Sequence, residues 1–112
     1  MENLYHYRGV VTDVYDGDTI TVNVDLGFHV TLTNERFRLY RINAPEVSGT
    51  ERDKGLISKD WLRNRILNKE VILVTCKDKK EKYGRWLADI RLDGICINDE
   101  LVENGLAEYK DY

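Results

Sequence analysis

The stretch Phe37-Arg-Leu-Tyr-Arg-Ile-Asn-Ala-Pro-Glu46 guides the interpretation of the whole chain. Its first four residues predict a strand, in which side chains point alternately to the two faces. Phe37 and Leu39 lie on one predicted face. Arg38 and Tyr40 lie on the other, so the sequence predicts a basic side chain fixed on a rigid strand.

The same stretch ends in a loop that gathers polar side chains. Pro45, the only proline in the chain, disfavours a helix and keeps Asn43 and Glu46 in a loop. A cation on a strand, followed by an amide and a carboxylate, is an arrangement suited to chemistry. An amphipathic strand that ends in an ordinary turn explains the same residues, so the rest of the chain must decide.

Length and composition indicate one domain, residues 1–112, with a core: 42% of the residues are apolar and 33% are charged. No apolar run approaches the roughly 20 residues that span a bilayer, and the first residues do not resemble a secretion signal. We therefore expect a cytoplasmic monomer without membrane contact, or a secreted protein if a signal was removed. The net charge of −3 argues mildly against binding nucleic acid by bulk positive charge.

Cysteine and histidine are too few for several common kinds of site. Cys76 and Cys96 are twenty residues apart, and only His6 and His29 accompany them, so we expect buried thiols and no zinc site. The shortage of histidine also argues against Ser/His/Asp and Cys/His nucleophile systems. An enzyme with this composition would use carboxylates, arginines and a metal.

Short strands are predicted in the first third of the chain. Residues 10–15 and 19–24 are rich in β-branched residues, and Asp16-Gly17 between them is a two-residue hairpin signal that we attribute to a positive φ at glycine. A further strand is predicted over residues 28–32. Residues 33–35 then predict a turn that leads into the strand at Phe37.

One long helix is predicted next, starting between Thr50 and Asp53 and ending near Asn68. Thr50 with Asp53 resembles a capping box, and Ser48 with Glu51 competes for that role. Apolar residues recur at helical spacing and predict packing against the core; they are Leu56, Ile57, Trp61, Leu62 and Ile66.

The last third of the chain predicts two strands and a second helix. The strands cover residues 71–76 and 85–92, and Asp93-Gly94 predicts another two-residue turn. Asn98 is expected to cap the helix, and Gly105 to end it. Five or six short strands and two helices, in the order β-β-β-α-β-β-α, predict a mainly β (α+β) fold. The best match is a five-stranded Greek-key barrel of the oligonucleotide-binding type.

Four pieces of the sequence carry a resemblance when taken together. They are VYDGDTITV (14–22), FRLYRINAPE (37–46), KYGRWLADI (82–90) and LVENGLA (101–107). Each piece alone is weak, but their order and spacing cover nearly the whole chain, and as a set they resemble the staphylococcal nuclease family. The resemblance implies a nuclease-like barrel that binds one Ca²⁺ and cuts phosphodiester bonds of DNA or RNA.

The resemblance also implies a ligand set for the calcium ion. Asp18 matches a metal-ligand carboxylate, Asn43 the second side-chain ligand, and the backbone carbonyl of Ala44 a third. Asp16 matches an acidic neighbour that reaches the ion through water. Calcium accepts carboxylates, carbonyls and waters, so these residues suit it.

The catalytic and nucleotide-binding roles follow from the same resemblance. Glu46 matches the residue that positions or deprotonates the attacking water. Arg38 and Arg85 match the pair that binds the phosphate and stabilises the transition state, in which negative charge develops on phosphoryl oxygens. Tyr83 matches an aromatic beside the bound nucleotide, and Tyr112 is a candidate for stacking near it.

Asn43 is the main departure from the family's pattern, because the best-known member has an aspartate there. An amide oxygen can still bind calcium, but the site has one negative charge fewer, and its affinity should fall. A catalytically weak or inactive barrel that binds nucleic acid or protein is therefore an alternative. A purely structural domain of a larger assembly is a third interpretation.

Overall fold

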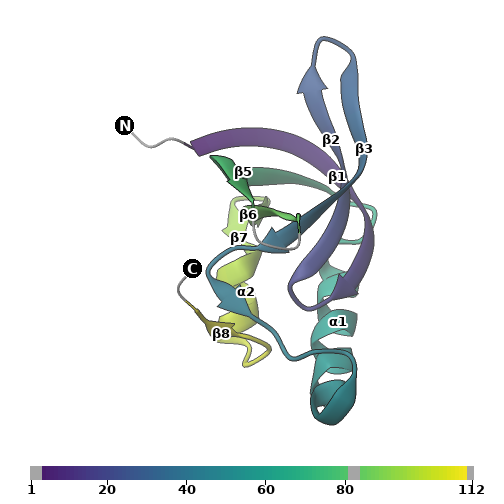
Figure 1. Ribbon diagram of the computed structural model, residues 1–112, viewed down its shortest axis with the longest axis vertical. Coiled ribbons are helices and arrows are strands. Elements are labelled where there is room, and N and C mark those ends of the chain that lie inside the picture. The colour runs from purple at the N-terminus through teal and green to yellow at the C-terminus, as the bar shows by residue number, and fades with distance from the viewer. Residues whose placement is uncertain (1–3, 81–83, 111–112) are drawn as a thin grey trace.

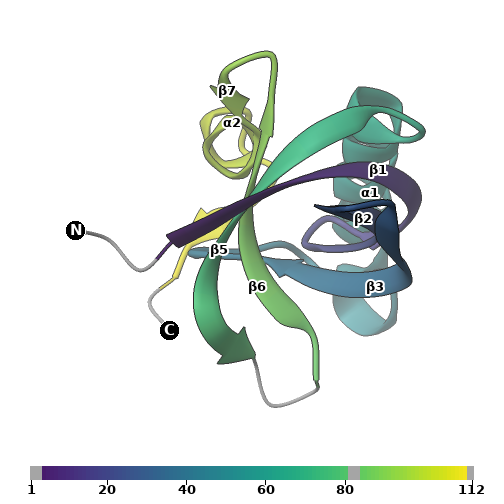
Figure 2. The same ribbon diagram turned by 90° about the horizontal axis from the view of Figure 1, so that it is seen from above.

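The computed structural model describes residues 4–80 and 84–110 and contains a closed five-stranded barrel (Figures 1 and 2). Antiparallel pairing links neighbours in the order β3, β2, β1, β5, β6, and a parallel pairing between β3 and β6 closes the barrel. The strands are β1 (Leu4–Asp16), β2 (Thr19–Gly27), β3 (Val30–Leu39), β5 (Glu70–Lys80) and β6 (Trp86–Leu92). The predicted oligonucleotide-binding barrel is confirmed.

Two helices and several short elements complete the described part of the chain. The helix α1 (Arg52–Ile66) follows the short helix η1 (Gly49–Glu51) and packs against β1, and α2 (Ile97–Glu103) packs against β6. The short strands are β4 (Ile42–Asn43), β7 (Ile95–Cys96) and β8 (Glu108–Tyr109), and β4 pairs with β8. Neither helix has the length and apolarity required to cross a membrane.

The core lies inside the barrel and continues under both helices. Strand residues such as Val11, Leu39 and Ile90 are fully buried, and Leu62 of α1 and Leu101 of α2 join the same cluster. From Ala88 to Leu92 of β6, buried residues alternate with less buried ones, which is the pattern of a strand with one face on a core. Burial of these side chains is the main favourable contribution to folding.

The first hairpin differs from its prediction by one residue. Asp16 pairs with Thr19, so the turn consists of Gly17 and Asp18, and Gly17 does not have a positive φ. Glycine is required for another reason: a Cβ on it would lie 2.7 Å from the Cβ of Ala44 and 2.9 Å from that of Ser58. The turn, the loop after β4 and α1 therefore meet at Gly17.

The predicted turn at residues 33–35 is wrong, because β3 runs through it without a break. Asn34 has a φ of 57° within a bulge of β3, and its N–H donates to Oδ1 of Asn23 at 2.9 Å. The turn between β2 and β3 is Phe28-His29 instead, with φ values of 57° and 63°. Phe28, predicted as the first residue of the strand, therefore lies outside β3. This hairpin projects from the barrel at the top of Figure 1.

The first helix starts within its predicted range, at Arg52, but the predicted caps of both helices are wrong, whereas two turn signals are confirmed. Neither η1 nor α1 has a side-chain cap, so neither capping box forms. Asn98 is not a cap: α2 begins at Ile97, and the Asn98 side chain is fully buried. Asp93-Gly94 forms the predicted turn, and Gly105, at a φ of 71°, ends α2.

Candidate functional site

The site is built around the buried carboxylate of Asp18, in the turn between β1 and β2. Its Oδ2 accepts a hydrogen bond from the Ala44 N–H at 2.9 Å and lies 3.4 Å from Nη2 of Arg38. Asp18 and Arg38 are 6% and 8% exposed, and the Asp18 carbonyl accepts from the Leu39 N–H at 2.8 Å. The end of β3 and the loop after β4 are thereby fixed to one aspartate that is distant from both in sequence.

Arg38 brings the predicted metal ligands together. Its Nη1 donates to the Ile42 carbonyl at 3.0 Å, and its Nη2 donates to Oδ1 of Asn43 at 3.1 Å. Oδ2 of Asp18 and Oδ1 of Asn43 therefore converge on one positively charged nitrogen. A carboxylate oxygen and an amide oxygen are ligand types that Ca²⁺ accepts, so the chemistry of these donors fits the ion that the resemblance implies.

Arg85 reaches the same carboxylate through Thr19. Its Nη1 donates to the hydroxyl of Thr19 at 2.7 Å, and that hydroxyl donates to Oδ1 of Asp18 at 3.3 Å. Thr19 pairs with Arg38 across β2 and β3, and it is 2% exposed. The sequence argument gave Thr19 no role, although its place directly after Asp18 in a recognised motif was a signal.

Asp16 adds a second carboxylate beside Asp18. Its Oδ1 accepts from the Asp18 N–H at 3.1 Å. Burial, and then the negative charge of Asp18, raise the pKa of Asp16 to about 7. A cation bound nearby would oppose this rise, because it favours the ionised carboxylate.

The carboxylate count at this site is low for a metal centre. No group of three or more His, Cys, Asp or Glu side chains suitable for a metal ion occurs within residues 4–80 and 84–110. The predicted ligand set has one carboxylate in direct contact, an amide and a backbone carbonyl. The Ala44 backbone does lie at Asp18, through its N–H, while its carbonyl remains a predicted ligand.

The loop after β4 is held against α1 by a second glycine. A Cβ on Gly55 would overlap the backbone carbonyl of Glu46, so only glycine lets the loop lie this close to the helix. The Glu46 side chain itself is exposed, two residues beyond the buried Ala44. A glycine inside a helical pattern often marks such an approach, and this signal was available in the sequence.

The remaining predicted residues, Tyr83 and Tyr112, lie outside the described residues.

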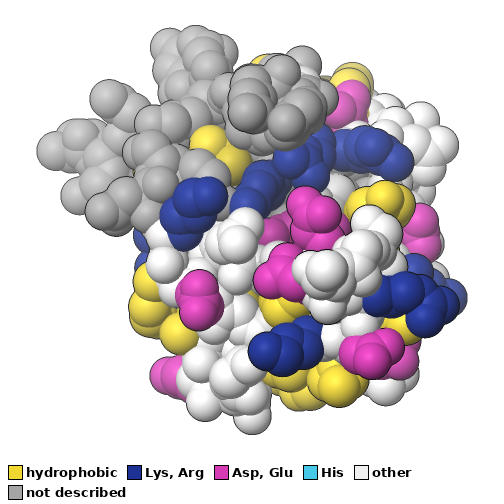
Figure 3. Space-filling model, turned by 60° about the horizontal axis from the view of Figure 1, so that its bottom comes forward, with side chains coloured by type: hydrophobic (Ala, Val, Ile, Leu, Met, Phe, Trp, Pro, Cys, Tyr) yellow, Lys and Arg dark blue, Asp and Glu magenta, His cyan; other side chains and the backbone are white. Residues whose placement is uncertain are grey.

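Figure 3 views the end of the molecule that is lowest in Figure 1. Lys and Arg side chains form a band on this face, directly beside Asp and Glu side chains. A surface of this kind offers both anion-binding and cation-binding groups within a small area.

The barrel and its acid–arginine centre define an oligonucleotide-binding-fold domain with a preformed polar site. Residues 36–112 match the family model described as staphylococcal nuclease homologue. The chain belongs to this family, as the four sequence motifs predicted.

Similar proteins come from bacteria and archaea. The thermonuclease of Staphylococcus intermedius is 31% identical over 92% of this chain and 60% of its own length. An uncharacterized protein of Methanocaldococcus jannaschii is 32% identical over 91% of this chain and 58% of its own. An uncharacterized endonuclease of Escherichia coli O157:H7 is 34% identical, with shares of 94% and 63%. The chain thus spans about three-fifths of the length of these relatives.

Proposed function

We propose that this protein hydrolyses phosphodiester bonds of DNA or RNA with the help of Ca²⁺. The observation that carries the proposal is the convergence of Asp18 and Asn43 oxygens on Arg38, with Arg85 tied to the same carboxylate through Thr19. Relatives named thermonuclease and endonuclease support the same activity.

Asp18, Asn43 and the carbonyl of Ala44 would hold the ion, and Asp16 would contact it through water. When bound, calcium supplies positive charge that favours the extra negative charge on the phosphoryl oxygens in the transition state. The neighbouring Asp16 would then be ionised at neutral pH, since a nearby cation lowers the pKa of a carboxyl group.

Arg38 and Arg85 would bind the phosphate oxygens. A guanidinium stays charged and donates two parallel hydrogen bonds to an anion, which a lysine cannot do. Both arginines already contact the residues around Asp18, so little conformational freedom is lost when the substrate binds. Their contacts would strengthen as charge develops, which lowers the barrier.

Glu46 would accept the proton of the attacking water. Its side chain is exposed, and its backbone is fixed against Gly55. A positioned general base contributes about 10²–10⁴-fold to the rate.

Cleavage assays with single-stranded DNA and RNA test the proposal. We expect cleavage at millimolar calcium that stops when chelator is added, and a loss of about 10²-fold or more in Glu46→Gln. Glu51→Gln is the matched control, because Glu51 is also exposed and lies in η1, outside the site. Absence of chelator-sensitive cleavage would contradict the enzymatic proposal.

A nucleic-acid-binding module without catalysis is the second candidate. The Arg38–Asp18 ion pair favours it, because that pair neutralises the buried carboxylate without a metal. The same oligonucleotides, assayed by fluorescence anisotropy in chelator, separate the two. Binding without cleavage at any calcium concentration would favour the module.

A further inference from the structure

Arg41 occupies a backbone position that an arginine seldom adopts. It lies in the turn between β3 and β4, with a φ of 70° in the left-handed region. Residues other than glycine, asparagine and aspartate are disfavoured there, because Cβ approaches the backbone. A side chain kept at such a position implies compensating contacts.

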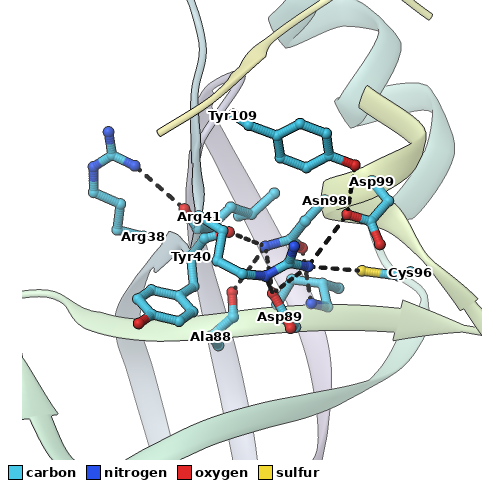
Figure 4. Close-up of polar contacts among 11 residues, drawn as sticks. Arg38, Tyr40, Arg41, Ala88, Asp89, Cys96, Asn98, Asp99 and Tyr109 are labelled. Carbon is cyan, nitrogen blue, oxygen red and sulfur yellow. Dashed lines mark hydrogen bonds and ion pairs between the residues drawn. The ribbon is translucent and has the colours of Figure 1, made fainter. Parts of the chain in front are cut away.

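The Arg41 side chain has these contacts on two other elements, as Figure 4 shows. Its Nε and Nη2 lie 3.3 and 3.2 Å from Oδ1 of Asp89 on β6. Its Nη2 also lies 3.2 Å from Oδ1 of Asp99 on α2. That Oδ1 accepts a further hydrogen bond from the hydroxyl of Tyr109 at 2.9 Å. We call Arg41, Asp89, Asp99 and Tyr109 the Arg41 cluster.

The backbone beside Arg41 is fixed as well. The Arg41 carbonyl accepts from the Lys110 N–H at 2.8 Å. The Tyr40 N–H donates to the Ala88 carbonyl at 2.9 Å, and the buried Asn98 amide donates to the Tyr40 carbonyl at 2.9 Å. The turn is thus attached to β6, α2 and the segment after β8.

The next two residues belong to the proposed site. Ile42 presents its carbonyl to Arg38, and Asn43 presents its Oδ1 to the same guanidinium. Ala44 follows and donates to Asp18. A rotation at Arg41 would therefore move the predicted ligand Asn43 relative to Asp18.

We propose that Arg41 is a positioning residue whose ion pairs with Asp89 and Asp99 fix Asn43 and Ala44 against Asp18, an inference that rests on the proposed function. The cluster contains none of the residues predicted to bind the metal or the phosphate. It sets the geometry of the residues that do, and geometric precision of this kind controls the affinity of metal sites.

Arg41→Asn tests the proposal, because asparagine accepts the left-handed backbone and removes the ion pairs. We expect the calcium Kd, measured by calorimetry, to rise about 10-fold, as for other residues that orient ligands. Amide hydrogen exchange at Ala44, measured by NMR in chelator, should accelerate. Cleavage should need more calcium but recover towards the wild-type rate at saturation. Arg41→Lys should give intermediate values.

Arg65→Met is the matched control. Arg65 donates to Oε1 of Glu100 at 2.9 Å, so it also ties α2 to the molecule, next to Asp99 in sequence. We expect this variant to lower the Tm but to leave the calcium Kd and the Ala44 exchange rate unchanged. If both variants change these two quantities equally, Arg41 has only a general stabilising role, and the proposal is overturned.

Unchanged Ala44 exchange in Arg41→Asn would also overturn it. Should Arg41→Asn fail to fold, Asp99→Asn removes one of the two ion pairs at a half-exposed position and is judged by the same measurements. If the wild-type protein neither cleaves nucleic acid nor binds calcium, the proposed function fails. The exchange comparison in chelator then still decides whether Arg41 positions Ala44.

Discussion

Arg38 and Arg41 lie three residues apart, and each forms ion pairs with aspartate, but their surroundings differ. The side chains of Arg38 and Asp18 are 10% and 9% exposed, and Arg38 contacts the atoms predicted to bind metal. The Arg41 side chain is 38% exposed, and its partners belong to β6 and α2. Arg38 contacts residues of the proposed site, whereas Arg41 joins the segment that carries Asn43 to β6 and α2.

The carboxylates of the Arg41 cluster respond differently to their surroundings. At Asp89, burial outweighs the charge of Arg41 and raises the pKa. At Asp99, burial is opposed by the hydrogen bond from Tyr109 and the charge of Arg41, and the pKa is lowered. Asp99 is therefore the partner that stays ionised when the pH falls, because its ionised form is better stabilised.

Replacing each arginine by lysine should produce the largest difference in cleavage rate between the site around Arg38 and the Arg41 cluster. Arg38→Lys keeps the charge but removes the fork that contacts Asn43 and the Ile42 carbonyl. We expect the cleavage rate at saturating calcium to fall about 10²–10³-fold, the effect of losing a donor to transition-state charge. Arg41→Lys should change that rate only slightly. If initial-rate assays show equal losses of cleavage rate in Arg38→Lys and Arg41→Lys, the two arginines do not have the different roles that we infer.

Asp16 gives a pH test of the site in chelator. Its pKa is raised from 3.8 to about 7 in the folded protein, so its contribution to stability is lost as the pH rises through this range. Asp16→Asn should therefore gain about 1–2 kcal/mol in free energy of unfolding relative to wild type by neutral pH, after discounting for solvent exposure. Urea denaturation at several pH values measures this difference.

Asp13→Asn is the control for this pH test, because Asp13 is an exposed residue of the same strand. This variant removes the same unit of charge outside the Gly17-Asp18 turn. If the free energies of unfolding of wild type and Asp16→Asn change in parallel with pH, then burial and the charge of Asp18 do not destabilise ionised Asp16 as we infer.

The sequence predicted the residues of the proposed site better than it predicted the Arg41 cluster. The pattern of residues 37–46 singled out Arg38 and Asn43, the family resemblance added Asp18, and the structure brings these side chains together. The Arg41 cluster was not predicted. Its ion pairs join residues 48 and 58 positions apart, and an arginine in left-handed conformation has no sequence signal.

Two polar residues misled the sequence argument for a common physical reason. Asn34 favours a positive φ, which occurs in turns and in bulges alike, so a bulge of β3 was predicted as a turn. Asn98 is a good helix cap, but its side chain bonds the Ile90 N–H and the Tyr40 carbonyl instead. Local preferences could not reveal these contacts, because the partners come from other elements.

Asn43→Asp should change the calcium affinity of the site around Arg38 only modestly. The added charge would lie beside Nη2 of Arg38, at the place where the amide oxygen now lies 3.1 Å away. Contacts to an ionised group are about twice as strong as neutral ones, so we expect the calcium Kd to fall about fivefold. Asn23→Asp serves as the control, because Asn23 lies further along β2 and is bonded only to Asn34 among described side-chain contacts. Calorimetry at fixed ionic strength distinguishes a ligand at position 43 from a general effect of charge. A Kd that falls equally in both variants would mean that Asn43 does not bind the ion, and that Arg38 alone uses its amide oxygen.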